Sequence, residues 1–478
     1  MKLDVNELLL IPAKRCWSKL TNDEQEKLQR QLDSLDKARC LQAVQEAFST
    51  TQSETIPEDV LKPVDQSRCL NLSRVEEQAR KHLFELGMEA IAKGHVAVIL
   101  LSGGQGTRLG SAQPKGFYDV GLPSHKSLFQ LQAERLLRLQ AMAAARQNAQ
   151  AVTANIVWCI MASELTEASV KAFFETHNYF GLSPSQVVFF SQGSMPCFDN
   201  NGKVILDAPD HIAVAPDGNG GLYEALGNHG ILDMLAEKGV QYVHVYCVDN
   251  ILVRVADPCF VGFCQQMNAD CAAKSVERQD PFEPIGVICR RDGKPAVLEY
   301  SEISRKLAQE RDGNGQLMLR HGNIANHMFS LSFLQRVVKD NCHLPYHIAR
   351  KKIPFLSEDG RFVVPDSVNG FKLEKFIFDV FPYSKSFAVL EVAREEEFSP
   401  LKNSDTAKVD CPTSCRQDLY HLHRKWIEAA AGRFFKGADG AVVCEVSPLL
   451  SYAGEDIVLE EQTPLESPML LRASGELG

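Results

Sequence analysis

The sequence predicts an α/β fold with a mixed, mostly parallel central sheet, a helical N-terminal region and a small β-rich C-terminal module. From residue 95 onward, apolar runs of strand length alternate with amphipathic helical patterns; the runs are "HVAVILL", "NIVWCIM", "QVVFF" and "YVHVYCV". Continuous apolar runs are typical of strands buried on both faces, and their alternation with helices indicates βαβ units. The 478 residues, 45% hydrophobic and 23% charged, are enough for two or three globular domains.

The first ninety residues show the spacing of helices. In "NDEQEKLQRQLDSLDKARCLQAVQEAF" leucines recur at helical intervals among charged side chains. A second helix is predicted over residues 72–93, where apolar side chains recur every three or four positions. Ser73 followed by Glu76 has the spacing of a capping box, and Gly94 stands where the helix would end. We therefore predict a helical N-terminal domain over residues 1–92.

The rest of the chain divides into a central and a C-terminal part. Between the strands of the central domain, residues 93–397, helices are predicted over about 127–147, 167–181 and 222–238. The C-terminal domain, residues 398–478, is predicted to hold one helix at about 416–431, then short strands separated by turns. Since parallel sheets bind ligands at the carboxyl ends of their strands, the loop after the first strand is the place to search for a site.

Charge and composition exclude several classes of protein. The formal net charge is −10, and an acidic chain without a long basic block is a poor candidate for binding nucleic acid. There is no run of eighteen apolar residues, and the N-terminus lacks the basic start and long apolar core of a signal peptide. The fourteen cysteines stand mostly in apolar surroundings, which favours reduced, buried thiols. We expect a cytoplasmic protein with no membrane partner.

A glycine-rich stretch, "LLSGGQGTRLGSAQPKG", directly follows the first strand. It lacks the Gly-Lys-Ser/Thr of a P-loop, and Gly104, Gly106 and Gly110 are spaced one residue too widely for a dinucleotide fingerprint. What remains is a loop whose bare backbone N–H groups can approach phosphate closely, flanked by Arg108 and Lys115. A solvated basic turn is the alternative, and the position after a buried strand favours the phosphate loop.

Three further stretches carry candidate residues. "APDGNGGLYEAL" opens a helix on a second glycine-rich turn, which either is ordinary turn chemistry or forms the other side of a nucleotide cleft. Asp249 ends a buried strand, where a carboxylate is either a cap or a Mg²⁺ ligand near substrate phosphates; the two glycine-rich turns favour the metal. Of the lysines that follow residue 370, Lys402 in "FSPLKN" is the one constrained by its local turn, whereas lysines are usually solvated.

These motifs resemble a known family. "LSGGQGTRLGSAQPKG" is similar to the signature L-x2-G-x-G-T-x-[ML]-G-x4-P-K of sugar-nucleotide pyrophosphorylases. "APDGNGGLYEAL", "HVYCVDNILVRVADP", "LEYSEIS", "GNIANHMFS", "EFSPLKN" and "SPLLSYAGE" resemble the eukaryotic UDP-N-acetylhexosamine pyrophosphorylases, also called UDP-N-acetylglucosamine diphosphorylases. The resemblance runs from about residue 93 to 456. It implies a Rossmann-like, GT-A-like nucleotidyltransferase domain flanked by smaller N- and C-terminal domains.

The resemblance also implies a reaction and its partners. UTP and N-acetylglucosamine 1-phosphate would give UDP-N-acetylglucosamine and pyrophosphate, reversibly and with Mg²⁺ on Asp249. N-acetylgalactosamine 1-phosphate would be a second substrate, and the protein would be a monomer or a homodimer. No side chain needs to become a covalent nucleophile, so catalysis would be positioning and charge neutralisation. That assigns Arg108 and Lys115 to the departing β and γ phosphates, and Lys402 to the attacking phosphate.

Binding residues follow from the matched motifs. The uridine would be contacted by the loop of Leu101, Ser102, Gly103 and Gly104, where serine replaces the alanine more frequent at the second position. The uracil would be read by Gln192 and the Gly218 backbone, and Lys372 would meet the UTP side. The sugar would be held by Asn219, Gly286, Glu299, Tyr300 and Asn323, of which the residues at 286, 299 and 300 would shape the N-acetyl pocket.

Two other functions remain open. One is a uridylyltransferase that forms UDP-glucose or uses several sugars; "LEYSE" and "GNIAN" argue against it. The other is a catalytically idle relative that binds nucleotide sugar as a regulator or scaffold. Intact Arg108, Lys115, Asp249 and Lys402 argue against that alternative.

Overall fold

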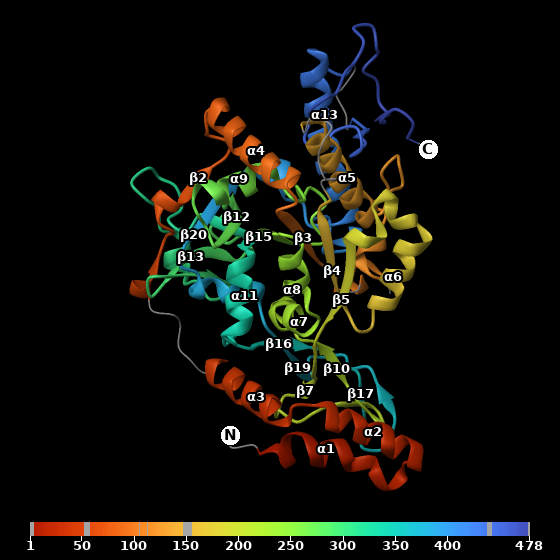
Figure 1. Ribbon diagram of the computed structural model, residues 1–478. Coiled ribbons are helices and arrows are strands. Elements are labelled where there is room, and N and C mark those ends of the chain that lie inside the picture. The colour runs from red at the N-terminus through yellow and green to blue at the C-terminus, as the bar shows by residue number, and fades with distance from the viewer. Residues whose placement is uncertain are drawn as a thin grey trace. The chain divides into compact units, whose positions relative to one another are not determined.

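The computed structural model describes residues 4–51, 58–104, 106–111, 113–146, 155–436 and 442–476 (Figure 1). The chain forms two compact units, each built from separate segments. Unit 1 comprises Met1–Thr55, Ser191–Asn228 and Val338–Val380, and unit 2 comprises Ile56–Phe190, His229–Val337 and Phe381–Gly478. The three domains predicted from the sequence, with boundaries at residues 92 and 397, are defined by sequence pattern and not by these contacts. They stay a prediction.

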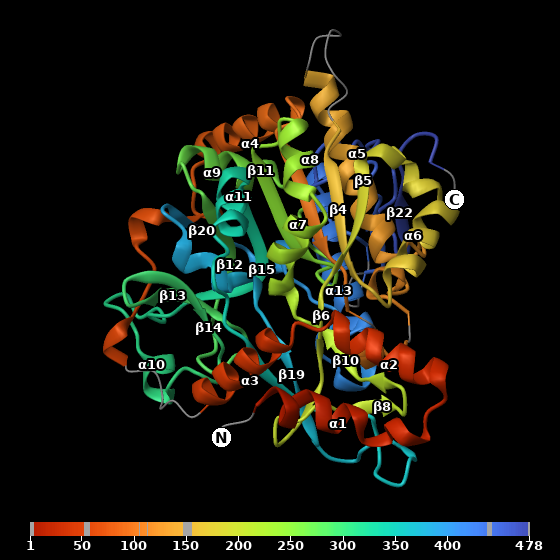
Figure 2. The same cartoon turned by 60° about the horizontal axis from the view of Figure 1, so that its bottom comes forward.

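Unit 2 is built on a large mixed sheet. Its strand order is β2-β20-β12-β15-β11-β3-β4-β5, and Figure 2 shows most of these strands side by side. β15 runs antiparallel to both its neighbours, whereas β2–β20, β20–β12, β11–β3 and β3–β4 are parallel pairs. The strands of this sheet are β1 Leu61–Lys62, β2 Cys69–Asn71, β3 Val96–Leu101, β4 Val157–Ser163, β5 Val187–Gln192, β11 Tyr242–Cys247, β12 Cys271–Glu277, β13 Val287–Arg291, β14 Lys294–Leu298, β15 His321–Ser330 and β20 Phe387–Val392. A separate pair is formed by β21 Cys444–Val446 and β22 Met469–Leu471.

Helices of unit 2 share one apolar core with this sheet. α4, α5, α6 and α9 bury side chains in the same cluster as Trp158, Ile160 and Tyr246 of the strands. β3 and β4 are buried along their whole length, as continuous apolar runs predict. The helices are α4 Glu77–Ala92, α5 Leu128–Arg146, α6 Glu167–Thr176, α8 Ile231–Glu237, α9 Pro258–Gln266, α10 Arg305–Gln309, α11 Leu331–Lys339, α12 Arg394–Glu397 and α13 Pro412–Ala431.

Unit 1 packs N-terminal helices on small antiparallel sheets. Leu28 and Leu32 of α2 and Val44 of α3 share a core with Phe198 and Phe371 from the strands. β19 pairs with both β16 and β7, and β10 with β6. Its elements are α1 Ile11–Ala13, α2 Asn22–Ser34, α3 Lys37–Thr51, β6 Ser194–Pro196, β7 Phe198–Asp199, β8 Leu206–Ala208, β9 His211–Ile212, β10 Val214–Pro216, α7 Leu222–Asn228, β16 His347–Lys351, β17 Phe355–Leu356, β18 Phe362–Val363 and β19 Gly370–Glu374.

The predicted α/β class and mostly parallel sheet are confirmed, and two details of the prediction are wrong. The helix predicted over 222–238 is divided into α7 and α8, because Gly230 adopts a left-handed conformation with φ of 64°. The capping box on Ser73 is absent, since α4 begins at Glu77 and no side chain caps it. The predicted C-terminus of that helix is correct: Lys93 caps it and Gly94 follows with φ of 72°.

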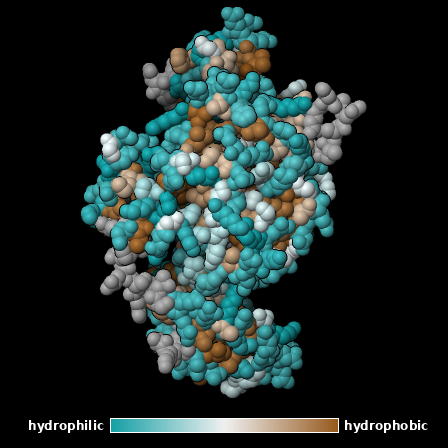
Figure 3. All heavy atoms as spheres, turned by 60° about the vertical axis from the view of Figure 1, so that its left-hand side comes forward, coloured by the Kyte–Doolittle hydropathy of each residue, from teal (hydrophilic) through white to brown (hydrophobic). Residues whose placement is uncertain are grey.

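On the face drawn in Figure 3, hydrophobic side chains form small groups among hydrophilic ones. Large hydrophobic side chains that are exposed, such as Phe434 and Val458, come from separate parts of the chain. None of the helices within the described residues is long and apolar enough to cross a membrane.

The crossing of α4 and α9 depends on two glycines. A Cβ on Gly87 of α4 would lie 1.9 Å from the carbonyl oxygen of Pro258, and a Cβ on Gly262 of α9 would lie 1.9 Å from that of Leu83. Distances this short are far inside van der Waals contact, so the helices pack backbone against backbone at both positions.

We expect Gly262→Ala to lower the free energy of unfolding by about 3 kcal/mol, because the added methyl group would force two packed helices apart. Scanning calorimetry measures this as a lower Tm. Gly313→Ala is the matched control, since a Cβ at Gly313 would meet nothing within 4 Å. Equal Tm values for the two variants would contradict the packing argument.

Candidate active site

The strand ends of unit 2 bring the predicted site segments to one edge of the sheet. In the register of the parallel pair, Leu101 at the end of β3 lies opposite Cys247 at the end of β11. Across the antiparallel strand, Glu277 at the end of β12 lies opposite His321 at the start of β15. The glycine-rich loop, the turn after β11 and the start of β15 therefore all lie at the carboxyl edge, where parallel sheets bind ligands.

The glycine-rich loop folds back on itself after β3. The amide of Gly106 donates to the carbonyl of Gln113 at 3.0 Å, and the amide of Ser111 donates to the carbonyl of Gly106 at 3.1 Å. Gly104 is exposed, and a Cβ there would contact nothing within 4 Å. Arg108 is also exposed. The loop thus has open backbone at Gly104 and an exposed side chain at Arg108.

The residue that joins β3 to this loop carries a buried hydroxyl. Ser102 has no exposed surface, and its amide donates to the carbonyl of Met161 at 2.8 Å. Its Oγ has no hydrogen-bond partner among the described residues. An unsatisfied buried hydroxyl costs about 1–3 kcal/mol, a cost that the alanine expected at this position would not carry. Serine therefore fits in size, but it reduces stability.

Lys115 and Asp249 meet at the carboxyl edge. The Nζ of Lys115 lies 3.7 Å from Oδ2 of Asp249, and it donates to the carbonyl oxygen of Leu401 at 3.1 Å. Both side chains are partly exposed, at 16% and 22%. The backbone amide of Leu401 in turn donates to the carbonyl of Asp249 at 2.8 Å. The structure thus brings Lys115, Asp249 and the residue before Lys402 together.

Lys402 begins a closed loop. Its amide and that of Asn403 both donate to the carbonyl of Asp410, at 2.8 and 2.9 Å. Its Nζ lies 6.0 Å from the centre of the Phe398 ring. Burial raises the pKa of the Asp410 carboxyl, and the charge of Asp249 raises it further against the opposing effect of Lys402. Lys402 therefore lies in an environment that also holds the two carboxylates.

Residues predicted to shape the N-acetyl pocket lie close together in unit 2. The amide of Asn323 donates to the carbonyl of Gly286 at 2.8 Å. A Cβ on Gly286 would lie 3.5 Å from Oε1 of Glu299, so glycine leaves space beside that carboxylate. The amide of Glu299 donates to the side chain of Glu302, which fixes the loop. Tyr300, the next residue, is 52% exposed.

The residues predicted to read the uracil gather within unit 1. The Nε2 of Gln192 donates to the carbonyl of Gly218 at 3.1 Å and lies 3.4 Å from Oδ1 of Asp217. Gly218 has φ of 86°, a conformation that favours glycine. The Oδ1 of Asn219 accepts from the amide of Ile377 at 2.9 Å, so this side chain also fixes the turn. Gln192, Gly218 and Asn219 are thus one connected group.

One member of this group, Lys375, was not predicted from the sequence. Lys375 lies just after β19, three residues beyond Lys372, and its backbone packs against the turn. Its carbonyl accepts from the amide of Gly220 at 2.9 Å, and its amide donates to the carbonyl of Asp217 at 2.8 Å. Its Nζ lies 3.6 Å from Glu224. Burial raises the pKa of Asp217 to about 6, with Lys375 acting in the opposite direction. No local sequence pattern separates Lys375 from the other lysines of its segment.

The carboxylates at the sheet edge are compatible with one Mg²⁺ ion. Within the described residues, no group of three or more histidine, cysteine, aspartate or glutamate side chains could hold a metal. Mg²⁺ is commonly bound by one or two carboxylates together with substrate phosphates and water rather than by a cage of protein ligands. Asp249, partly exposed beside Lys115, supplies such a carboxylate.

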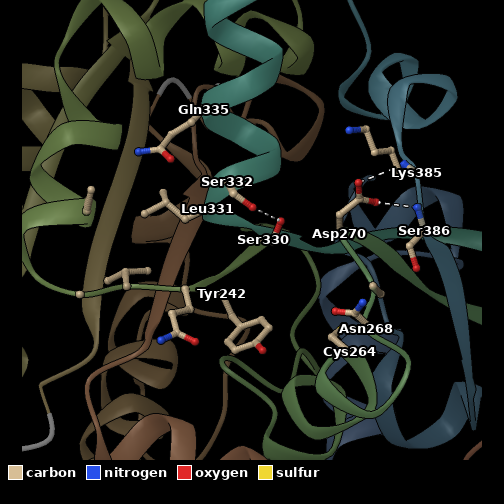
Figure 4. A pocket seen from close by; sticks show the side chains of 15 residues that line it. Tyr242, Cys264, Asn268, Asp270, Ser330, Leu331, Ser332, Gln335, Lys385 and Ser386 are labelled. Atoms are coloured by element: carbon tan, nitrogen blue, oxygen red, sulfur yellow. Dashed lines mark hydrogen bonds between the residues drawn. The ribbon is translucent and has the colours of Figure 1, made fainter.

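A pocket of about 690 Å³ lies at the opposite edge of the sheet (Figure 4). It is lined by Tyr242, where β11 begins, and by Ser330, where β15 ends. Its central carboxylate, Asp270, accepts hydrogen bonds from the amides of Lys385 and Ser386, both at 3.0 Å. The Asp270 carboxylate is thus bonded within the pocket wall, and no residue of the glycine-rich loop lines the pocket.

A mostly parallel sheet that ends in a glycine-rich loop, lysines and a carboxylate is the arrangement of a nucleotidyltransferase. A protein-family model described as UTP–glucose-1-phosphate uridylyltransferase matches residues 39–439. The chain belongs to this family.

Relatives within the family carry more specific names. The chain is 47% identical to UDP-N-acetylhexosamine pyrophosphorylase-like protein 1 of Homo sapiens, over 86% of this chain and 84% of the relative. It is 43% identical to UDP-N-acetylglucosamine pyrophosphorylase of Saccharomyces cerevisiae, over 92% of each chain. The fold is similar to the crystal structure of the uridine diphosphate N-acetylglucosamine pyrophosphorylase of Trypanosoma brucei in complex with inhibitor, at a TM-score of 0.84 and 29% identity over the full length of both. The family resemblance predicted from the motifs is confirmed.

We expect Asp217→Asn to stabilise the protein above pH 7, by on the order of 2 kcal/mol. The folded-state pKa of about 6 lies above the ordinary value of 3.8, so the ionised carboxylate opposes folding. The loss of folding free energy caused by the ionised Asp217 carboxylate is complete above pH 6 and disappears as the pH falls toward 4. The difference in Tm between variant and wild type should therefore be largest at pH 8 and shrink by pH 4.5.

Asp366→Asn, an exposed carboxylate of the same unit, controls for the loss of one charge. A Tm difference for Asp217→Asn that does not change with pH would contradict the burial effect.

Proposed function

We propose that this protein transfers a uridylyl group from UTP to N-acetylglucosamine 1-phosphate, and also to N-acetylgalactosamine 1-phosphate, and releases pyrophosphate. The observation that carries the proposal is the assembly of Lys115, Asp249 and the Lys402 segment at the carboxyl edge, beside the glycine-rich loop. The names of the relatives supply the N-acetylated sugar.

In the proposed reaction, a phosphate oxygen of the sugar phosphate attacks the α-phosphorus of UTP. The bond from that phosphorus to the bridging oxygen breaks, and pyrophosphate leaves with the electron pair. Arg108 and Lys115 neutralise the leaving β and γ phosphates. Lys402 binds the attacking phosphate and offsets its repulsion by UTP. Positioned charges of this kind commonly contribute about 3 kcal/mol each to transition-state stabilisation.

Asp249 would hold a Mg²⁺ ion, which when bound withdraws charge from phosphate oxygens. Because Lys115 already lies 3.7 Å from this carboxylate, the cationic side chain and the carboxylate are arranged to face the same polyphosphate. Lys115 also donates to the Leu401 carbonyl, which holds its ammonium group at the sheet edge.

The N-acetyl group would be recognised by Gly286, Glu299 and Tyr300, and Asn323 would bind sugar hydroxyls. Glycine at position 286 leaves room beside Glu299, and the polar groups there would be left without partners by a sugar that lacks the amide. A site built to hydrogen-bond a substrate rejects an analogue without those bonds strongly.

We expect Lys402→Ala and Arg108→Ala each to lower kcat by about a hundredfold, since each removes one charge contact to a phosphate. A coupled assay for pyrophosphate measures this. Lys408→Ala, an exposed lysine of the same loop as Lys402, is the control and should keep its activity. Near-normal turnover in either variant would refute the role proposed for the residue that it replaces.

A panel of sugar 1-phosphates tests the substrate class. We expect kcat/KM for N-acetylglucosamine 1-phosphate to exceed that for glucose 1-phosphate by at least about a hundredfold, because unpaired polar groups penalise glucose. Comparable values would favour the UDP-glucose alternative that the family description also covers. Binding of UTP with no pyrophosphate released from any sugar phosphate would favour the idle relative.

A further inference from the structure

Asn250 directly follows Asp249 and pairs with the segment that leads to Lys402. Its backbone forms an antiparallel bridge with Pro400. The amide of Ile251 donates to the carbonyl of Ser399 at 3.1 Å, and the amide of Leu401 donates to the carbonyl of Asp249 at 2.8 Å. The turn after β11 is thus paired with the chain that leads from α12 to Lys402.

The side chain of Asn250 adds two hydrogen bonds to this pairing and one within its own turn. Its Nδ2 donates to the carbonyl of Glu397 at 2.7 Å, and its Oδ1 accepts from the amide of Ser399 at 3.0 Å. The same oxygen accepts from the amide of Leu252 at 3.3 Å. Asn250 is 4% exposed, so these bonds form away from water, where an unmade bond is costly.

Glu397, whose carbonyl accepts from Asn250, is itself fixed by buried charges. Its carboxylate forms an ion pair with Lys274 of β12, which also lies 2.6 Å from Asp257. Lys274 has no exposed surface and Glu397 is 1% exposed. Arg254 lies 3.8 Å from Glu397. The Glu397 end of the Lys402 segment is therefore held to the sheet, and a shift at Asn250 cannot be absorbed there.

We propose that Asn250 is a positioning residue that fixes the distance between Asp249 and Lys402. The two groups sit on separate segments, and the asparagine carboxamide adds a buried cross-link to the backbone pairing between those segments. It touches neither phosphate in the proposed reaction; it acts through the residues on either side. This inference rests on the proposed function only for the catalytic roles of Asp249 and Lys402.

We expect Asn250→Ala to lower kcat about tenfold to a hundredfold, with the KM for UTP within about twofold of wild type. Misplacement of a reacting group by about 1 Å can cost on the order of a hundredfold in rate. The residues assigned to the uracil, Gln192 and Gly218, belong to unit 1 and make none of the Asn250 contacts named above. A drop in kcat therefore separates positioning from general damage to the nucleotide site.

Gln186→Ala is the matched control. Gln186 is also a buried amide of unit 2, 4% exposed, and its side chain makes three hydrogen bonds, to Gln140, Ile156 and Ser183. It precedes β5, away from the carboxyl edge. Its loss should lower Tm as much as Asn250→Ala does, and leave kcat unchanged. An equal fall in kcat for both variants would reduce Asn250 to a stability role and overturn the proposal.

A double-mutant cycle tests the route of action. If Asn250 acts through Lys402, Asn250→Ala should change kcat by less than about twofold in a Lys402→Ala background, because coupled residues are not additive. Full additivity would overturn the proposal.

Hydrogen exchange tests the positioning without any turnover. The amides of Ile251 and Leu401, both donors in the pairing, should exchange at least about tenfold faster in Asn250→Ala and not in Gln186→Ala. Unchanged exchange would overturn the proposal whatever the activity. Faster exchange in a protein whose wild type turns over no sugar phosphate would refute the proposed function and leave the positioning intact.

Discussion

The parallel pairing of β3 with β11 is the constraint on which the site of unit 2 depends. Its register places Leu101 opposite Cys247. The loop that begins with Ser102 and the turn that carries Asp249 therefore start side by side at the carboxyl edge of the sheet. Lys115 can then reach Asp249 and the carbonyl of Leu401 with one ammonium group. A shift of one residue would move each strand's side chains to the opposite face and separate these groups.

Burial gives the charged groups of this protein two distinct uses. Lys274, Asp257 and Glu397 are all buried, and Lys274 pairs with both carboxylates, so their charges hold segments in place. Lys115, Asp249 and Arg108 are partly or fully exposed at the sheet edge and remain accessible to an anionic ligand. A buried pair is costly to break and contributes little when left intact, which suits the first group to fixing geometry.

Four strands of the large sheet, β3, β4, β5 and β11, could be predicted from sequence because they are continuous apolar runs, and their positions agree with the structure to within two residues. Lys115 and Asp249 could be placed because each directly follows such a strand or its loop. The break at Gly230, the pairing of Asn250 with the 397–401 segment and the approach of Lys375 to Gly218 could not be predicted. The last two depend on contacts between segments distant in sequence, for which local periodicity carries no signal. The break at Gly230 comes instead from a left-handed glycine inside a helical pattern.

The crossing of α4 and α9 also restricts how the sequence can change. The atoms that a side chain at Gly87 or Gly262 would strike are the carbonyl oxygens of Pro258 and Leu83, which belong to the main chain. Main-chain atoms are present whatever residue is encoded there, so no second substitution at those positions can make room. A larger residue at either glycine therefore cannot be compensated by a second substitution at the contacted residue. At ordinary core positions, by contrast, a smaller neighbour can offset a larger side chain.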